Sequence, residues 1–232
     1  EGIRVMKWSG AAERRIEEYL GAVEKHLAHK PAAVRKDVVG GLRNQIAEAL
    51  DRMLDLSARE RRALARPATW RMPLGITPYY LSLLAAEPPD GPLRRTMLPD
   101  LREAHMAPGE RLDSLGEAAH QVAPGLVRSY PRKALLLAAG DCACFCRYCT
   151  RARTAGQPPP APAEALAWLR RNPAIRDVLV SGGDPLTLGD ARLESILKAL
   201  RSIPHVELIR IGTKVPATLP QRITPALVRM LR

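Results

Sequence analysis

All four cysteines of the chain lie between positions 142 and 149. Three of them, Cys142, Cys146 and Cys149, follow the spacing C-x3-C-x2-C. Three thiolates on one short loop can bind three irons of a cubane [4Fe–4S] cluster and leave the fourth iron open to another ligand. The apolar run 134–139 comes shortly before the loop and is typical of a buried strand. The sequence therefore predicts a strand that ends in an iron–sulfur loop.

Other uses of clustered cysteines fit this pattern less well. A structural zinc site usually combines two separated pairs of ligands, and no second pair follows the loop. Disulfides between residues this close would be strained, and we find no export signal before them. Cys144 lies between two expected ligands, and the cluster does not need it. We interpret Cys144 as a neutral substitution by a small residue.

Polar and glycine residues also follow the next two predicted strands. Strand 177–180 leads into Ser181-Gly182-Gly183-Asp184, and strand 206–211 leads into Gly212-Thr213-Lys214. Helices are predicted before and after the first of these strands, over 163–171 and 193–202. This βα alternation is typical of parallel strands, whose carboxyl ends meet on one side of the fold. We therefore expect the three loops to lie together.

In this order, the motifs resemble the lysine 2,3-aminomutase family of radical S-adenosylmethionine (SAM) enzymes. The resemblance extends from about Leu54 to the last residue, and several independent runs make it specific. These runs are Tyr130-Pro131, Leu135-Leu136-Leu137, Cys146-Arg147-Tyr148-Cys149-Thr150-Arg151, 180–184, 203–207, Ile211-Gly212 and 219–225.

The resemblance implies a role for each matched residue. The three spaced cysteines would bind the cluster, and SAM would be bound by Tyr148, Ser181, Gly182, Gly183 and Asp184.

Two further roles follow from the same resemblance. Tyr130 and Lys133 would contact pyridoxal 5′-phosphate (PLP), with Lys133 in the place of a family arginine. Arg151 would bind the carboxylate of an amino-acid substrate. The lysine that forms the Schiff base with PLP in the family has no counterpart here, so we assign no catalytic residue.

The implied activity is that of an amino-acid 2,3-aminomutase, with lysine as the favoured substrate and β-lysine as the product. A reduced cluster would cleave SAM to a radical, which takes a hydrogen from the PLP-bound amino acid before the nitrogen migrates. Glutamate 2,3-aminomutase and the isomerase that modifies elongation factor P are alternatives of the same build. A non-catalytic interaction protein with a degenerate barrel and a zinc-binding nucleic-acid module are alternatives of other classes.

The expected fold class is α/β, a partial (β/α) radical SAM barrel truncated after about three βα units, with a helical N-terminal extension. Residues 1–56 predict a helical hairpin, which weakly resembles the HAAS type of bacterial membrane-signalling proteins. Residues 57–126 predict a connector of helices and loops, in which Ser57 begins one helix and Thr77-Pro78 another. Residues 127–232 predict the first half of the barrel.

Charge, hydropathy and cysteine content limit the classes of partner and the location that we expect for this chain. The net charge is +12, but the arginines are spread along the chain rather than gathered in a stripe, so a nucleic-acid partner is not expected. No apolar run reaches membrane-spanning length. Reduced cysteines predict a cytoplasmic location. The family resemblance implies a reducing flavodoxin or ferredoxin and a homo-oligomer as partners. Because the chain starts at Glu1 and lacks the later barrel units, we expect it to be a fragment.

Overall fold

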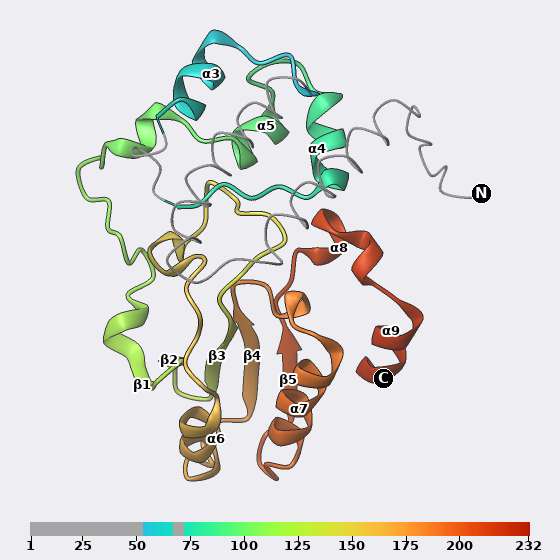
Figure 1. Ribbon diagram of the computed structural model, residues 1–232. Coiled ribbons are helices and arrows are strands. Elements are labelled where there is room, and N and C mark those ends of the chain that lie inside the picture. The colour runs from blue at the N-terminus through green and yellow to red at the C-terminus, as the bar shows by residue number, and fades with distance from the viewer. Residues whose placement is uncertain (1–52, 67–71) are drawn as a thin grey trace, which may run out of the picture. The chain divides into compact units, whose positions relative to one another are not determined.

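A mixed sheet of five strands forms the centre of the computed structural model, which describes residues 53–66 and 72–232 (Figure 1). The described residues belong to one structural unit, Met53–Arg232. Nearly all of the helical hairpin expected over residues 1–56 lies outside the described residues. Within them, no helix is both long enough and apolar enough to cross a membrane.

The strands follow one another across the sheet in chain order. They are β1 (Gln121–Ala123), β2 (Leu126–Tyr130), β3 (Lys133–Ala139), β4 (Asp177–Gly182) and β5 (Leu208–Ile211). Strands β3, β4 and β5 are parallel, which confirms the βα alternation, with bounds that differ from the predicted ones by one or two residues. Strands β1 and β2 are antiparallel to their neighbours and were not predicted. The observed fold is therefore α/β with a mixed sheet.

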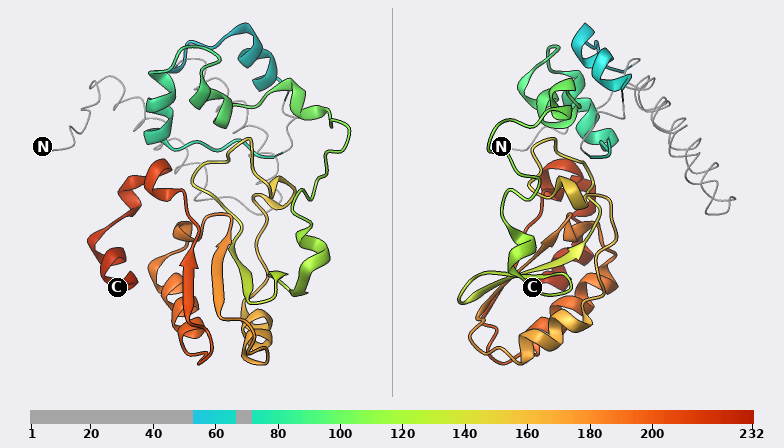
Figure 2. Two further views of the ribbon diagram at one scale, coloured as in Figure 1. Left: turned by 180° about the vertical axis from the view of Figure 1, so that it is seen from behind. Right: turned by 90° about the vertical axis from the view of Figure 1, so that its left-hand side faces the viewer.

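Helices α6 (Ala163–Arg170) and α7 (Asp190–Arg201) connect the parallel strands and cover one face of the sheet (Figure 2). The buried core lies between them and that face: Leu136, Val178 and Val180 from the strands meet Leu169 and Leu200 from the helices. Along β3 and β4 the side chains between these buried ones point to the opposite face. That opposite face carries Lys133, Asp177 and Arg210.

The connector contains the short helices α3 (Ala58–Leu64), α4 (Pro78–Ala85) and α5 (Pro92–Met97), with 3-10 turns η2 (Leu101–Ala104) and η3 (Glu117–His120). Both predicted helix starts are confirmed. Ser57 and Glu60 form a capping box on α3, and the Thr77 hydroxyl accepts the N–H of Tyr80 at 3.1 Å. Helix α5 was not predicted, because the prolines around it indicated a loop.

After β5 the chain forms α8 (Val215–Thr218) and α9 (Pro225–Leu231), and short 3-10 turns η4 (Ala152–Thr154), η5 (Pro185–Thr187) and η6 (Pro220–Arg222) complete the fold. A second buried cluster, of Leu186, Leu193, Val215 and Leu227, holds these last helices against α7. The sheet is open, because β1 and β5 each pair with one neighbour. A barrel is therefore not observed in the described residues.

Candidate functional site

The three loops expected to meet at the carboxyl ends of β3, β4 and β5 do meet. They line one cavity of about 310 Å³, together with Thr218 of α8 (Val215–Thr218). The cysteine loop contributes Cys142, Ala143, Cys144, Cys146, Tyr148, Cys149, Thr150 and Arg151. The other loops contribute Ser181, Gly182, Gly183, Asp184, Gly212, Thr213 and Lys214. Parallel strands thus bring residues more than 60 positions apart into one site.

The three predicted cluster ligands are half-buried in this cavity. Cys149 Sγ accepts the N–H of Arg151 at 3.4 Å, and Lys214 Nζ lies 3.3 Å from Cys146 Sγ. Burial, followed by the negative charge of Asp184, raises the pKa of the Cys142 thiol to about 12. Iron binding at this thiol must therefore displace a proton.

The donor set fits a cluster better than a single ion. In the described part of the chain, no three His, Cys, Asp or Glu side chains converge closely enough to hold one metal ion. A cubane cluster instead distributes three thiolates over three irons, and N–H groups near the sulfurs stabilise the ligated thiolates. Cys142, Cys146 and Cys149 are the residues that would hold it.

Cys144 has a structural environment that sets it apart from the three other cysteines. Its side chain is 3% exposed, and its Sγ accepts the backbone N–H of Thr77 at 3.3 Å. The Thr77 hydroxyl in turn donates to the carbonyl of Thr218. Cys144 therefore bonds the cysteine loop to Thr77 at the start of α4, and Thr77 bonds this point to α8. Its interpretation as a neutral substitution stays a prediction.

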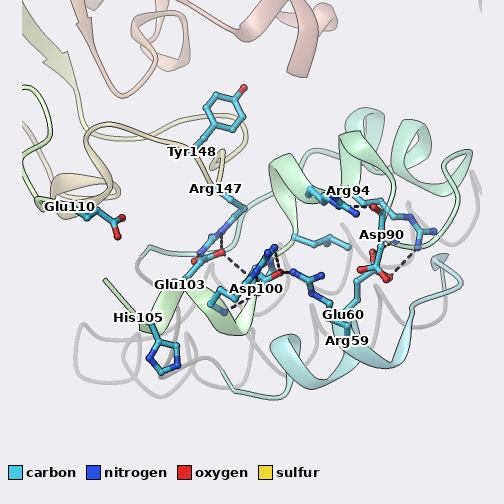
Figure 3. A pocket seen from close by; sticks show the side chains of 14 residues that line it. Arg59, Glu60, Asp90, Arg94, Asp100, Glu103, His105, Glu110, Arg147 and Tyr148 are labelled. Carbon is cyan, nitrogen blue, oxygen red and sulfur yellow. Dashed lines mark hydrogen bonds and ion pairs between the residues drawn. The ribbon is translucent and has the colours of Figure 1, made fainter. Parts of the chain in front are cut away.

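The connector anchors the cysteine loop from the side opposite the sheet. Arg147, between two expected ligands, pairs with Glu103 in η2 and donates to the carbonyl oxygens of Met72 and Pro73 at 3.3 and 3.0 Å. Figure 3 shows this pair and shows Tyr148 directed away from it. Because the Arg147 side chain bonds to the connector and does not line the cavity, it holds the neighbouring cysteines in place from outside that cavity.

Glycines allow the β4 turn to contact the backbone that precedes the cysteines. Gly182 adopts φ +115°, and a Cβ there would overlap the carbonyl oxygen of Ala139. Gly183 donates its N–H to that same oxygen at 2.6 Å, and Asp184 donates its N–H to Asp141 at 2.8 Å. In this structure the two glycines thus permit a close approach between the β4 turn and the backbone of Ala139 and Asp141. Their predicted contact with SAM stays a prediction.

The Asp184 carboxylate is buried and fully engaged. It accepts the hydroxyl of Thr213 at 2.6 Å and the backbone N–H groups of Leu186, Lys214 and Val215 at 3.0, 2.6 and 3.1 Å. These bonds fix the loop after β5 against the loop after β4. Ser181 is buried at the cavity wall, whereas Tyr148 is exposed at its rim.

Arg151 is held by a carboxylate of the same chain. Its Nε lies 3.0 Å from both Glu117 oxygens, and its Nη2 lies 2.6 Å from one of them. Glu117 is buried, and Arg153 lies 3.9 Å from it while also pairing with Asp113 at 3.1 Å. The third guanidinium nitrogen of Arg151, Nη1, takes no part in the pair with Glu117.

A neighbouring cavity of about 410 Å³ contains the two residues predicted to contact PLP. Tyr130 and Lys133 line it with Arg151 and Arg210. Lys133 Nζ lies 4.0 Å from Asp177, which also pairs with Arg210. Cationic side chains with a phenol suit a phosphate ester, and here these cations are paired with Asp177 and Glu117, which line the same cavity. Arg151 lines this cavity and the cysteine cavity, and so stands at their junction.

Sequence reasoning did not single out Glu117 or Glu103 as parts of this site. Glu117 lies 34 positions from Arg151 and Glu103 lies 44 positions from Arg147, and no sequence motif links either pair. Glu103 lies in η2 and Glu117 in η3, and a glutamate in a 3-10 turn gives no signal for a contact with a distant arginine. The predicted site residues, by contrast, all lie in one of the two cavities.

Comparisons with known proteins complete the description. The chain matches no protein-family model. It is 42% identical over 217 residues to the L-lysine 2,3-aminomutase of Acetoanaerobium sticklandii. The aligned region covers 90% of this chain and 52% of that protein. The L-lysine 2,3-aminomutase of Bacillus subtilis is 43% identical over 188 residues, covering 79% of this chain and 40% of that protein.

A relative with a different name is also similar. The glutamate 2,3-aminomutase of Clostridioides difficile is 36% identical over 198 residues, covering 82% of this chain and 46% of that protein. A match to 90% of the chain must extend into the residues before Leu54, further than the motifs alone indicated. Over most of its length the chain is similar to curated L-lysine 2,3-aminomutases, a radical SAM family, and it spans about half the length of the curated relatives it matches.

Proposed function

We propose that this chain forms the cluster- and SAM-binding part of a radical SAM amino-acid 2,3-aminomutase, an isomerase, with L-lysine as substrate. The observation that carries the proposal is the position of Arg151 between two cavities. One cavity contains the three spaced cysteines, and the other contains Tyr130 and Lys133. An amino acid whose carboxylate met Arg151 would lie between the proposed cluster and PLP sites.

The residues of the site have the properties that such chemistry requires. Cys142, Cys146 and Cys149 hold the cluster, while SAM is bound by Tyr148 and by the turn from Ser181 to Asp184. When bound, the cluster, SAM and PLP supply the radical chemistry. The chain positions them and excludes water, because the glycine turn and Arg147 fix the cysteine loop from opposite sides.

Arg151 orients the substrate in this proposal. Glu117 fixes the guanidinium plane and leaves Nη1 outside the pair, so a substrate carboxylate meets a preoriented donor. Tyr130 and Lys133 contact PLP, with Lys133 as a single-point cation where the family arginine would offer a fork. Neither Lys198 nor Lys214 lies in the family's Schiff-base motif, so the chain assigns no covalent PLP lysine.

Lysine is preferred to glutamate as substrate because four relatives named for lysine are 41–43% identical to this chain, whereas a relative named for glutamate is 36% identical; other relatives named or putatively named for lysine are 37–40% identical. We further propose the truncated-barrel architecture, a reducing flavodoxin or ferredoxin as electron donor and assembly as a homo-oligomer. A cytoplasmic location fits the need for a reducing compartment.

The test is an anaerobic assay of the gene product with iron, sulfide, SAM, PLP and dithionite, offered lysine or glutamate. We expect iron and sulfide to bind in a ratio typical of [4Fe–4S] and β-lysine to form from lysine. Formation of β-glutamate from glutamate, without β-lysine from lysine, would assign glutamate rather than lysine as the substrate. Absence of both products from protein with a full cluster would overturn the aminomutase proposal. Zinc in place of iron would restore the zinc-module alternative.

A further inference from the structure

Lys214 is a charged residue at the candidate site to which the expected chemistry gives no role. It follows Gly212 and Thr213 in the loop after β5, and its side chain crosses the cavity to the cysteine loop. Its Nζ lies 3.3 Å from Cys146 Sγ and 4.1 Å from the centre of the Tyr148 ring, and it also donates to the Tyr148 hydroxyl. The ammonium group is thus held between a sulfur and an aromatic ring.

The backbone of Lys214 is as well fixed as its side chain. Its N–H donates to Asp184 at 2.6 Å, and its carbonyl accepts the hydroxyl of Thr218 at 3.1 Å. The next residue, Val215, is fully buried. The lysine side chain therefore starts from a rigid point, and its reach toward Cys146 costs less conformational entropy than it would from a free loop.

No carboxylate side chain of the described residues forms an ion pair with this ammonium group. The ion pairs within the described residues include Lys133 and Lys198 but not Lys214. Asp184 is close, but its oxygens accept backbone N–H groups and the Thr213 hydroxyl. The sulfur of Cys146 and the phenol of Tyr148 are the groups that Lys214 Nζ contacts in the described part of the chain.

We propose that Lys214 raises the reduction potential of the cluster by donating a hydrogen bond to Cys146 Sγ. Reduction adds one electron, and so one negative charge, to the cluster and its thiolates. A positive hydrogen-bond donor on one of those sulfurs stabilises the more negative state, and hydrogen bonds to sulfur are among the factors that set cluster potentials. No bond to carbon or hydrogen breaks in this step.

The inference rests on the proposed cluster at Cys142, Cys146 and Cys149, but it does not require aminomutase activity. It can therefore be tested on this chain alone. The chain would be reconstituted anaerobically with iron and sulfide and titrated with dithionite, the source of the electron. Electron paramagnetic resonance of the reduced cluster gives the midpoint potential.

Lys214→Met is the main variant, since methionine has similar length and no charge. Lys198→Met is the matched control, because Lys198 lies on the exposed face of α7 and pairs only with Glu194 among its described neighbours. It removes the same unit of net charge at a distance from the cysteines. Lys214→Arg keeps the charge and the donor.

We expect a more negative midpoint potential in Lys214→Met, and potentials close to wild type in Lys198→Met and Lys214→Arg. Lys214→Gln, which keeps a donor without charge, provides a second neutral variant should Lys214→Met fail to hold its cluster. Equal potentials in wild type and in a neutral Lys214 variant, at equal iron and sulfide content, would overturn the inference. Failure of the wild-type chain to bind iron would instead overturn the proposed cluster site itself.

Discussion

The four cysteines are identical in chemistry and differ in their partners. Cys142, Cys146 and Cys149 are half-buried around one cavity, while Cys144 is buried and bonded to Thr77. Spacing alone predicted the three ligands, and the structure places all three around one cavity because they lie on one short loop. It could not show what holds Cys144, since that contact spans 67 positions.

This difference gives a prediction for paired variants. Cys144→Ala should keep the iron and sulfide content of the wild type and lower the free energy of unfolding by about 1–2 kcal/mol, because the Thr77 N–H loses its acceptor. Cys146→Ala should lose the cluster. Iron and sulfide analysis after anaerobic reconstitution, with urea unfolding of the cluster-free proteins, measures both effects. Loss of the cluster in Cys144→Ala would show that this cysteine is a ligand.

At the scale of elements, the parallel strands and crossover helices were predictable because their apolar periodicity is local. The β1–β2 hairpin was missed because each strand is short and polar on one side, with β2 ending in three exposed residues. Helix α5 was missed because Pro92 marks a helix start as readily as a loop. In both cases tertiary contacts, rather than periodicity, decide the structure.

Close backbone contacts hold the cysteine loop in this arrangement. A Cβ at Gly140 would overlap the carbonyl oxygen of Gln157, which is backbone and has little room to move. We predict that Gly140→Ala lowers the free energy of unfolding by about 3 kcal/mol. Gly189→Ala is the control, because a Cβ there meets nothing within 4 Å; since Gly189 is the N-cap of α7, the substitution should cost about 1 kcal/mol or less. Urea unfolding compares the two variants, and equal stabilities would contradict the prediction.

A second prediction at this scale concerns acid. Asp100 caps η2 and pairs with Arg59 of α3 (Figure 3). Partial burial would raise the pKa of Asp100, but hydrogen bonds from Arg102 and Arg59 outweigh it and lower the pKa to about 2. Because the folded pKa is below the unfolded one, this carboxylate stabilises the fold above about pH 4 and stops doing so as the pH falls through about 2.

Asp100→Asn should therefore be less stable than wild type near neutral pH, by about 1 kcal/mol after allowance for solvent screening. The difference should shrink between about pH 4 and pH 2. Urea unfolding of both proteins at several pH values in this range measures it. A difference that stays constant down to pH 2 would mean that the Asp100 charge does not stabilise the fold.

At the scale of the whole molecule, the open sheet has a consequence for association. Within residues 53–66 and 72–232, strand β5 pairs with β4 alone, which leaves its other edge without a neighbouring strand, and its first residue, Leu208, is 48% exposed. An open edge with an exposed apolar side chain favours pairing with another strand. The net charge of +12 opposes association, but salt weakens this repulsion over distances beyond about 8 Å at physiological ionic strength.

We predict that this chain self-associates through β5 and that Leu208→Lys weakens the association, because edge lysines must be desolvated when strands pair. Light scattering over a range of protein concentrations, at an ionic strength of about 0.15 M, measures the effect. Leu112→Lys is the matched control, since Leu112 is 65% exposed and lies outside any helix or strand. The two variants add the same charge and remove the same apolar side chain, so an equal effect of both would show that the β5 edge is not the contact. A purely monomeric wild type would contradict the prediction as well.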